Sequence, residues 1–430
     1  MGFWDKLRGL LGTTSTAGDA EPPRAPVRGT AEEAFAALFL DEARAHPAVE
    51  RAERVPGDFA VHLFRPGNAE PWTAFLGNLF QEAREDPPEE KVLRIRRFLS
   101  SLGTTETDLP WEDAAPRLVP LVRLATFGAG SNVTPLSRPF VPFLRMLVGV
   151  DNEDSVAIVD RSRFDEWKQS TDTVFAAAIS TLALHVRDDD VEVYDSEAAY
   201  PIWHVARDDS YESSRLALPG FLASFRGRVS GNPIAIVPNR STLIVSGDGD
   251  PAAIARLARS AEAEFMASPR AVSAAVYTLD SSDLVTPLHL PSEHPQHILV
   301  ERGHRVLAAT CYADQKAELE KRFEAENIDV FVASLSVSEH QESKQLTTMA
   351  TFAQGIRSLL PEADMIVFVT NESPDPSMTM VPWSTALELA GDCFERDPEL
   401  DPPRYRTVGW PPPAVLEGLR ARAVWRSDGS

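Results

Sequence analysis

The sequence predicts an α+β fold built from more than one domain, and three observations lead to this prediction. The chain has 430 residues, which is more than one hydrophobic core normally holds. Its composition, with 43% hydrophobic and 25% charged residues, is typical of globular proteins. Helical spacings of apolar residues are mixed along the chain with short β-rich runs and hairpins. We therefore expect a mixed helix and strand domain, followed by a smaller α/β domain.

The first twelve residues have the pattern of a short amphipathic helix. In MGFWDKLRGLLG, five apolar side chains share one helical face: Phe3, Trp4, Leu7, Leu10 and Leu11. A helix of this length is marginal by itself in water, so residues 1–12 are expected to dock against another surface. That surface is the folded body of the same chain, a groove on a protein partner or a membrane interface. Residues 13–29 have the composition of a flexible linker.

The larger predicted domain spans residues 30–290, with a helical part at 30–103 and a strand-rich part at 117–290. The helical part is expected to contain helices at 30–46, 71–84 and 90–103 and a strand at 59–64. The strand-rich part is expected to contain, in order, strands 117–126, 140–150 and 155–160, helix 163–184, strand 200–207, helix 211–226, hairpin 233–247, helix 251–267, and strands 273–280 and 283–290.

The smaller predicted domain spans residues 304–430 and shows the strand and helix alternation of an α/β domain. Residues 291–303, with Pro and Gly, are interpreted as the boundary before it. The expected elements are strand 305–312, helix 313–326, strand 328–337, helix 345–360, strands 364–370 and 378–383, and helix 384–395.

Two short stretches in the larger domain carry the polar residues of the candidate site. In DDSYESSRL, residues 208–216, Asp209 and Glu212 have the spacing of a helix capping box, and Glu212 and Arg215 form an i,i+3 pair. In VPNRST, residues 237–242, Pro and Asn suit a tight turn between strands. Together they define a candidate polar cluster of Asp208, Asp209, Tyr211, Arg215, Asn239 and Arg240.

The order and spacing of these stretches resemble the bacterial YtpQ-like family, a domain of unknown function. PRLVPLVR at 116–123 is similar to a strand of that family, and VAIVDRSRFDEW at 156–167 is similar to its strand, aspartate and helix. The resemblance covers roughly residues 30–288. The chain departs from the family pattern at Ser210, where Gly is common, and at Ser241, where Asp is usual. The resemblance implies an α+β fold and a cytoplasmic location, and it brings no established activity.

Charge and cysteine content exclude several classes of function. The chain has 42 Lys and Arg against 64 Asp and Glu, for a formal charge of -22, which disfavours nucleic-acid binding. It has no apolar run long enough to span a membrane and no secretory signal. Its two cysteines form no disulfide framework, which fits the cytosol. We expect a cytoplasmic protein, free or peripheral to a membrane or larger assembly.

Histidines near the predicted boundary are weak candidate metal ligands: His289, His294 and His297. Imidazole suits zinc, and Glu293 and His304 lie in the same stretch. Because no strong spacing such as H-E-x-x-H is present, solvated histidines on a loop are the favoured interpretation, and no metal or cofactor is expected. Cys311 lies in an apolar run and is expected to be a buried, inert thiol.

The favoured functional hypothesis is a non-enzymatic binding or adaptor protein that docks through residues 1–12 to a protein partner or a membrane interface. One alternative is a hydrolase that uses the carboxylates of the polar cluster with a metal or water. Another is an immunity-type protein whose acidic surface neutralises a basic partner. Exposed, aligned carboxylates would favour the hydrolase, whereas carboxylates engaged in capping and in pairing with Arg215 would favour binding.

Overall fold

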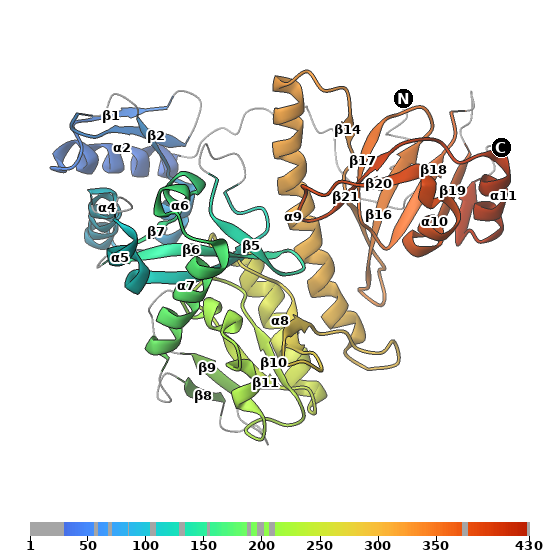
Figure 1. Cartoon of the computed structure of the whole chain (residues 1–430), viewed down its shortest axis with the longest axis horizontal. Helices are drawn as coiled ribbons and strands as arrows, with labels where there is room; N and C mark the ends of the chain where they lie inside the picture. Colours follow the sequence, from blue (N-terminus) through green and yellow to red (C-terminus); the bar gives the residue numbers. More distant parts are fainter. Residues whose placement is uncertain are drawn as a thin grey trace. The chain divides into compact units, whose positions relative to one another are not determined.

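The structure of the protein, a computed structural model, has the predicted α+β architecture, with helices and strands in several sheets (Figure 1). It describes residues 30–427 except for 56–58, 68–70, 85, 104–108, 129–133, 153–154, 187–190, 196–201, 206–210 and 372–376. The helix predicted at 1–12 and the linker predicted at 13–29 therefore lie outside the described residues. Within the described part, no helix combines the length and apolar character needed to cross a membrane.

The chain divides into two compact units, and each contains two segments of sequence. The first unit is Met1–Val119 with Val148–Thr181, and the second is Pro120–Leu147 with Leu182–Ser430. The chain passes between the units inside three elements: β4 (Leu118–Leu124), β6 (Leu144–Asn152) and α7 (Thr171–His185).

A three-stranded antiparallel sheet and three helices form the N-terminal part of the first unit. The sheet order is β1 (Arg51–Arg54), β2 (Ala60–Phe64) and β3 (Trp72–Phe75). The helices are α2 (Thr30–Ala45), α3 (Gly77–Glu82) and α4 (Pro88–Gly103). Phe39, Leu63 and Leu99 belong to their common core. The helix predicted over 71–84 is wrong in its first half, because 72–75 completes the sheet.

The rest of the first unit is a short strand with small helices. Its elements are α5 (Trp111–Ala114), η1 (Ala115–Arg117), β7 (Ser155–Ile158) and α6 (Arg161–Trp167). Asp160 caps α6, since its Oδ1 accepts a hydrogen bond from the backbone N–H of Arg163 at 2.7 Å. The single helix predicted at 163–184 is instead two helices, α6 and α7, and Lys168 between them has a φ of 53°.

The second unit begins with a six-stranded antiparallel sheet. In sheet order the strands are β13 (Val285–Pro287), β12 (Val276–Leu279), β10 (Pro233–Ile236), β11 (Ile244–Gly247), β9 (Ile202–Val205) and β8 (Val191–Asp195). Helix α8 (Pro251–Ala267) has the predicted bounds, and Asp250 caps it by accepting from the backbone N–H of Ala252 at 2.9 Å. Ile254 and Leu257 of α8 share a core with Ile234 and Ile236 of the sheet. A separate strand, β5 (Ser137–Val141), pairs with β6.

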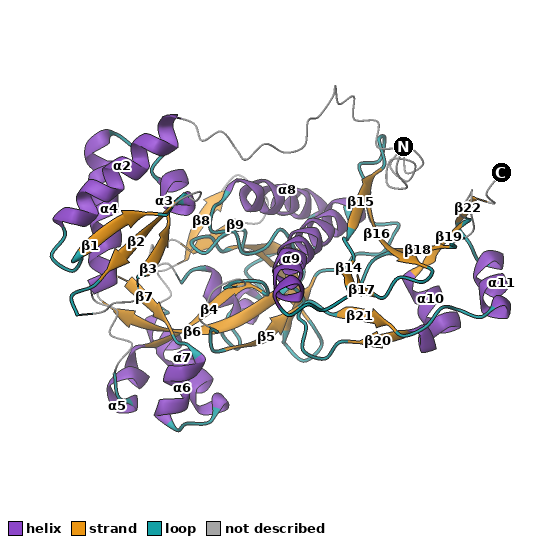
Figure 2. Cartoon of the chain, turned by 90° about the horizontal axis from the view of Figure 1, so that it is seen from above, coloured by secondary structure: helices purple, strands orange, loops and turns teal. Residues whose placement is uncertain are grey.

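Helix α9 (His297–Ala325) is the longest described element of the second unit, with 29 residues. Most of its buried residues recur every three or four positions and form one stripe: Val300, Gly303, Leu307, Cys311, Gln315, Leu319 and Phe323. Tyr312 is buried beside this stripe. It packs beside α8, as Figures 1 and 2 show, and also contacts β16 further along the chain. The strand predicted at 305–312 is wrong, because these residues are the middle of α9. The linker predicted to end at 303 contains its first two turns.

Two sheets complete the second unit. One has the order β14 (Phe331–Val332), β17 (Ser358–Pro361), β21 (Arg404–Thr407) and β20 (Phe394–Arg396). The other has the order β15 (Ser336–Glu339), β16 (Leu346–Ala353), β18 (Met365–Val369), β19 (Met378–Pro382) and β22 (Trp425–Ser427). The helical segments are α10 (Trp383–Ala390), η5 (Gly391–Cys393) and α11 (Pro413–Ala421). Phe352, Phe368 and Trp383 belong to their core.

The helix predicted at 345–360 is wrong, because this stretch forms β16 and most of β17. Strand β16 pairs with β15 on one side and with β18 on the other, and most of its side chains are buried. Gly355 joins the two strands with a φ of +81°, a left-handed conformation that glycine adopts without strain. Pairing on both sides of β16 therefore overrides the helical propensity of its Ala, Met and Leu residues.

Gly303 lies where α9 passes close to the backbone that precedes β12. A Cβ atom on Gly303 would stand 2.3 Å from the carbonyl oxygen of Ala274. Gly303→Ala is therefore expected to lower the free energy of unfolding by about 1–3 kcal/mol, because backbone must shift to relieve the overlap. Gly418→Ala in α11 is the matched control. Its Cβ would meet only Leu389 Cδ1 at 3.8 Å, so it should be neutral or stabilising by up to about 1 kcal/mol. Urea denaturation of both variants checks this, and equal effects would contradict it.

Candidate functional site

The first part of the candidate site is a pair of tight helical turns in the second unit. The helix predicted at 211–226 is instead two 3-10 segments, η3 (Ser213–Ala217) and η4 (Leu222–Phe225). Pro219 and Gly220 separate them, and Gly220 has a φ of +79°, so a continuous α-helix cannot form. The polar side chains of η3 face inward: Glu212, just before it, is 1% exposed, and Ser213, Ser214 and Arg215 are fully buried.

Strand β4 holds η3 through a side-chain hydrogen bond. The hydroxyl of Ser214 accepts from the backbone N–H of Val122 at 3.1 Å, and both groups are buried. Arg123 is the next residue of the strand, and its Nη1 donates to the carbonyl of Val122 at 2.8 Å. Arg123 therefore lies directly after the strand residue that binds η3.

A second segment, the Pro-Asn-Arg turn, contacts η3 through its backbone. The N–H of Ser213 donates to the carbonyl of Arg240 at 3.3 Å. Asn239 shapes the turn, since its Oδ1 accepts from the N–H of Ser241 at 3.0 Å. The N–H of Arg240 donates in turn to the carbonyl of Arg270 at 3.3 Å. These hydrogen bonds join three segments that lie far apart in the sequence.

Four arginines lie on the segments that these hydrogen bonds join, and we refer to Arg123, Arg215, Arg240 and Arg270 as the arginine cluster. Arg215 is fully buried, whereas the other three are partly exposed. Burial, together with the nearby positive charge of Arg270, lowers the pKa of Arg123 to about 10, against an opposing effect of Tyr211. The guanidinium remains charged at neutral pH. Two positive charges so close together are suited to an anionic group that contacts both.

The predicted polar cluster is represented in part by the described residues. Tyr211 is 5% exposed and Arg215 is fully buried, while Asn239 and Arg240 are partly exposed in the neighbouring turn. Asp208 and Asp209 lie outside the described residues. The capping box predicted for Asp209 and Glu212 depends on Asp209 and therefore stays a prediction. The sequence analysis missed Arg123 and Arg270 as site residues, although Arg123 ends the quoted stretch PRLVPLVR.

Of the three candidate metal ligands near residue 290, two hydrogen-bond to nearby backbone. His294 Nδ1 accepts from the N–H of Gln296 at 3.1 Å, and His297 Nδ1 donates to the carbonyl of Leu290 at 2.7 Å. His289 instead contacts Glu301 of α9, with 2.8 Å between Nδ1 and Oε1. Among the described residues His289, Glu301 and His304 form a group that could hold a metal ion.

The thiol of Cys311 is buried, as predicted, although it lies in a helix rather than a strand. It is fully buried in α9, with Sγ 3.8 Å from the carbonyl oxygen of Phe143. Burial raises the pKa of Cys311 to about 12, with smaller contributions from Asp314 and Asp401. The thiolate is therefore scarce at neutral pH, and Cys311 is not suited to act as a nucleophile.

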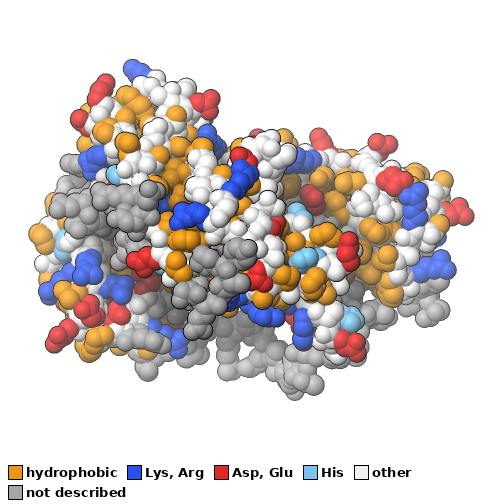
Figure 3. Space-filling view, turned by 90° about the horizontal axis from the view of Figure 1, so that it is seen from below, with side chains coloured by type: hydrophobic (Ala, Val, Ile, Leu, Met, Phe, Trp, Pro, Cys, Tyr) orange, Lys and Arg blue, Asp and Glu red, His pale blue; other side chains and the backbone are white. Residues whose placement is uncertain are grey.

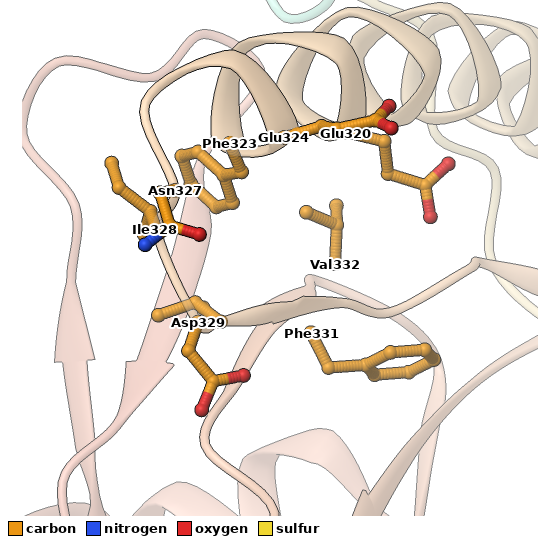
Figure 4. Close-up of a pocket in the computed structure, with 9 residues that line it drawn as sticks. Glu320, Phe323, Glu324, Asn327, Ile328, Asp329, Phe331 and Val332 are labelled. Carbon is orange, nitrogen blue, oxygen red and sulfur yellow. The ribbon is translucent and has the colours of Figure 1, made fainter.

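An open cavity of about 550 Å³ lies between the end of α9 and β14, and it shares no residue with the arginine cluster. Figure 4 shows Glu320 and Glu324 on the helix above Asp329 and Phe331. Lys316 of α9 pairs with Glu320 and lies 5.6 Å from the Phe331 ring centroid. The cavity is open to solvent, and its charged lining residues are all acidic: Glu320, Glu324 and Asp329. We therefore do not place the candidate site there.

Basic side chains are available on the surface despite the net negative charge. On the face drawn in Figure 3, Lys and Arg are interspersed with Asp and Glu.

No family model, curated protein or solved structure matches this chain. The resemblance to the YtpQ-like family therefore stays a prediction.

Proposed function

We propose that this chain is a non-enzymatic binding protein that captures an acidic segment of a partner protein through the arginine cluster and docks through residues 1–12. The observation that carries the proposal is that hydrogen bonds join η3, β4 and the Pro-Asn-Arg turn and so bring segments with four arginines together, with Arg123 close enough to Arg270 for their charges to interact. A preorganised set of guanidinium groups loses little freedom when it binds carboxylates, and each charged hydrogen bond contributes about 1.5–3 kcal/mol.

The burial of Glu212 argues against its use in hydrolysis, whereas Asp208 and Asp209 lie outside the described residues. A hydrolase at this position would need a carboxylate that can reach water or a metal together with the substrate. The side chain of Glu212 is 1% exposed, so it is not available to a substrate. Glu212 instead precedes η3, three residues before Arg215, and both side chains are buried.

Substitution of the partly exposed arginines tests the proposal. A fluorescein-labelled peptide of consecutive glutamates is expected to bind the full chain, with an affinity that falls as salt is added. Arg123→Gln and Arg240→Gln should each weaken binding by roughly tenfold or more, because each removes charged hydrogen bonds worth at least about 1.4 kcal/mol. Fluorescence anisotropy gives the dissociation constants.

Arg226→Gln is the matched control. Arg226 lies in the same unit, but it pairs on the surface with Asp283, with 2.9 Å between Nη1 and Oδ2, and the peptide affinity should not change. Equal losses in all three variants would show a general charge effect and refute the proposed site.

Deletion of residues 2–12 tests the docking role. It should leave peptide binding unchanged, and in cell fractionation the shortened chain should no longer be retained with the membrane or protein partner to which the full chain docks. Unchanged retention would remove the docking role. A basic peptide bound independently of the arginines would favour the neutralising alternative.

A further inference from the structure

Two histidines and a glutamate converge next to the start of α9, away from the arginine cluster. The candidate ligand atoms of His289, Glu301 and His304 all lie within 4.8 Å of one another. The two imidazole rings face each other with their centroids 4.8 Å apart. His289 Nδ1 lies 2.8 Å from Glu301 Oε1. Imidazole and carboxylate form the common ligand set of protein-bound zinc.

The secondary structure positions all three side chains. Glu301 and His304 are an i,i+3 pair, so they share one face of α9. His289 follows Leu288, which is buried and whose N–H donates to the carbonyl of Val276 at 2.8 Å. The segment that carries His289 is therefore anchored to β12 while its ring reaches α9.

A backbone hydrogen bond sets the tautomer of His304. Its Nε2–H donates to the carbonyl of Leu288 at 2.9 Å, so the lone pair of the neutral ring is on Nδ1. Metal-bound histidines commonly donate their second ring nitrogen to a carbonyl in this way, which orients the ring.

The positive charge nearest to this group is already paired. Arg305 Nη1 lies 3.1 Å from Glu301 Oε2. The same guanidinium binds Asp364 with two hydrogen bonds, from Nε at 2.9 Å and from Nη2 at 3.0 Å. Two carboxylates thus surround one guanidinium, and the remaining charge is negative. Glu301 Oε1 faces His289, so a cation can bind there without displacing Arg305.

We propose that His289, Glu301 and His304 bind a divalent zinc ion, with a water molecule completing the coordination. Around a tetrahedral ion with bonds of about 2.0–2.1 Å, neighbouring ligand atoms lie about 3.3 Å apart. The present separations are at most 4.8 Å and so differ from this value by no more than about 1.5 Å. His289, whose side chain is 65% exposed, has the freedom to move by that amount. The ion fastens the segment after β13 to α9.

Metal titration of the full chain, first stripped with a chelator, tests this site. Calorimetry should detect one equivalent of Zn²⁺, and Co²⁺ in its place should give the visible absorption of a four-coordinate site. His289→Ala and Glu301→Gln should each weaken Zn²⁺ binding by at least about 10–100-fold, the loss that even outer-sphere changes cause. His289 is exposed, so its variant should fold normally, and unfolding curves check both variants.

His294→Ala is the matched control, because His294 lies on the same segment outside the group. It should bind Zn²⁺ as the unmodified chain does. The proposal is overturned if the stripped chain takes up no Zn²⁺. It is also overturned if binding survives in both His289→Ala and Glu301→Gln, or falls equally in His294→Ala. These outcomes are independent of the arginine variants, since the two sites share no residue.

Discussion

Arg404→Ala is expected to lower the free energy of unfolding by about 3–5 kcal/mol, the range seen when one partner of a buried charged network is removed. Arg404 is fully buried in β21. Its guanidinium donates four hydrogen bonds: to Gln315 Oε1 at 2.6 Å and to the carbonyls of Ala333, Leu359 and Tyr312 at 2.8, 3.0 and 3.1 Å. Removing it leaves four buried acceptors without their donor, at about 1–3 kcal/mol for each that stays unsatisfied.

The position of Arg404 explains why one side chain has so large an effect. Its acceptors lie on α9, on the segment after β14 and on β17, so the guanidinium joins three elements of the second unit. Burial lowers the pKa of Arg404 to about 10, opposed by Tyr312 and Glu320, and the group stays charged at neutral pH. Arg404→Lys should also be destabilising, because one ammonium cannot reach acceptors spread around a planar guanidinium.

Arg406→Ala, two residues along the same strand, is the control for this prediction. Arg406 pairs with Asp397 at 3.0 Å and its side chain is 39% exposed, so its loss should cost less than about 1 kcal/mol. Urea denaturation followed by circular dichroism gives both values. Similar costs for Arg404→Ala and Arg406→Ala would show that the four buried hydrogen bonds contribute little.

The sequence predicted well those elements that have local start and stop signals. Helix α8 has a capping aspartate at 250 and a proline at 251, and its predicted bounds are correct. Only the second half of helix α9 was predicted, as the helix at 313–326, because residues 291–303 with Gly303 were interpreted as a boundary and 305–312 as a strand. The structure shows a different reason for the glycine: α9 approaches the carbonyl of Ala274 so closely that a Cβ has no room. That reason is a long-range contact, which a local pattern does not contain.

For the same reason, the sequence analysis did not identify the group of His289, Glu301 and His304. Glu301 and His304 share a helical face only if residues 301–304 are helical, and the sequence placed them at the end of a linker. Once α9 is known to begin at His297, the Glu-x-x-His spacing becomes visible. The described members of the candidate polar cluster, Tyr211, Arg215, Asn239 and Arg240, lie in the two quoted stretches, and their role as a site stays a prediction. Arg123 and Arg270 join it through backbone hydrogen bonds and β4, which depend on tertiary contacts.

Asp364→Asn is expected to lower the free energy of unfolding by about 1.5–3 kcal/mol at neutral pH, because it removes the negative charge from hydrogen bonds with Arg305. The carboxylate accepts two bonds from Arg305, at 2.9 and 3.0 Å, and two from Thr348, from its N–H and its hydroxyl, each at 2.8 Å. Burial alone would raise the pKa of Asp364, but the bonds from Arg305 and Thr348 outweigh it, so the pKa lies below its ordinary value.

This direction of the pKa fixes the pH dependence. The folded protein binds a proton at Asp364 less readily than the unfolded chain does, so the carboxylate stabilises the fold above the unfolded pKa of about 3.9. That contribution is lost as the pH falls through the lower folded pKa. Unfolding curves of the unmodified chain and of Asp364→Asn should therefore be furthest apart above about pH 5 and should converge in stronger acid. Asp283→Asn is the control, since Asp283 pairs with Arg226 on the surface and should change the curves little. A difference in stability between the unmodified chain and Asp364→Asn that stays constant down to the most acidic pH would contradict the prediction.

Asp364 also binds Arg305, which pairs with Glu301 Oε2. If this pairing is what leaves Glu301 Oε1 available to the metal, Asp364→Asn should also weaken Zn²⁺ binding.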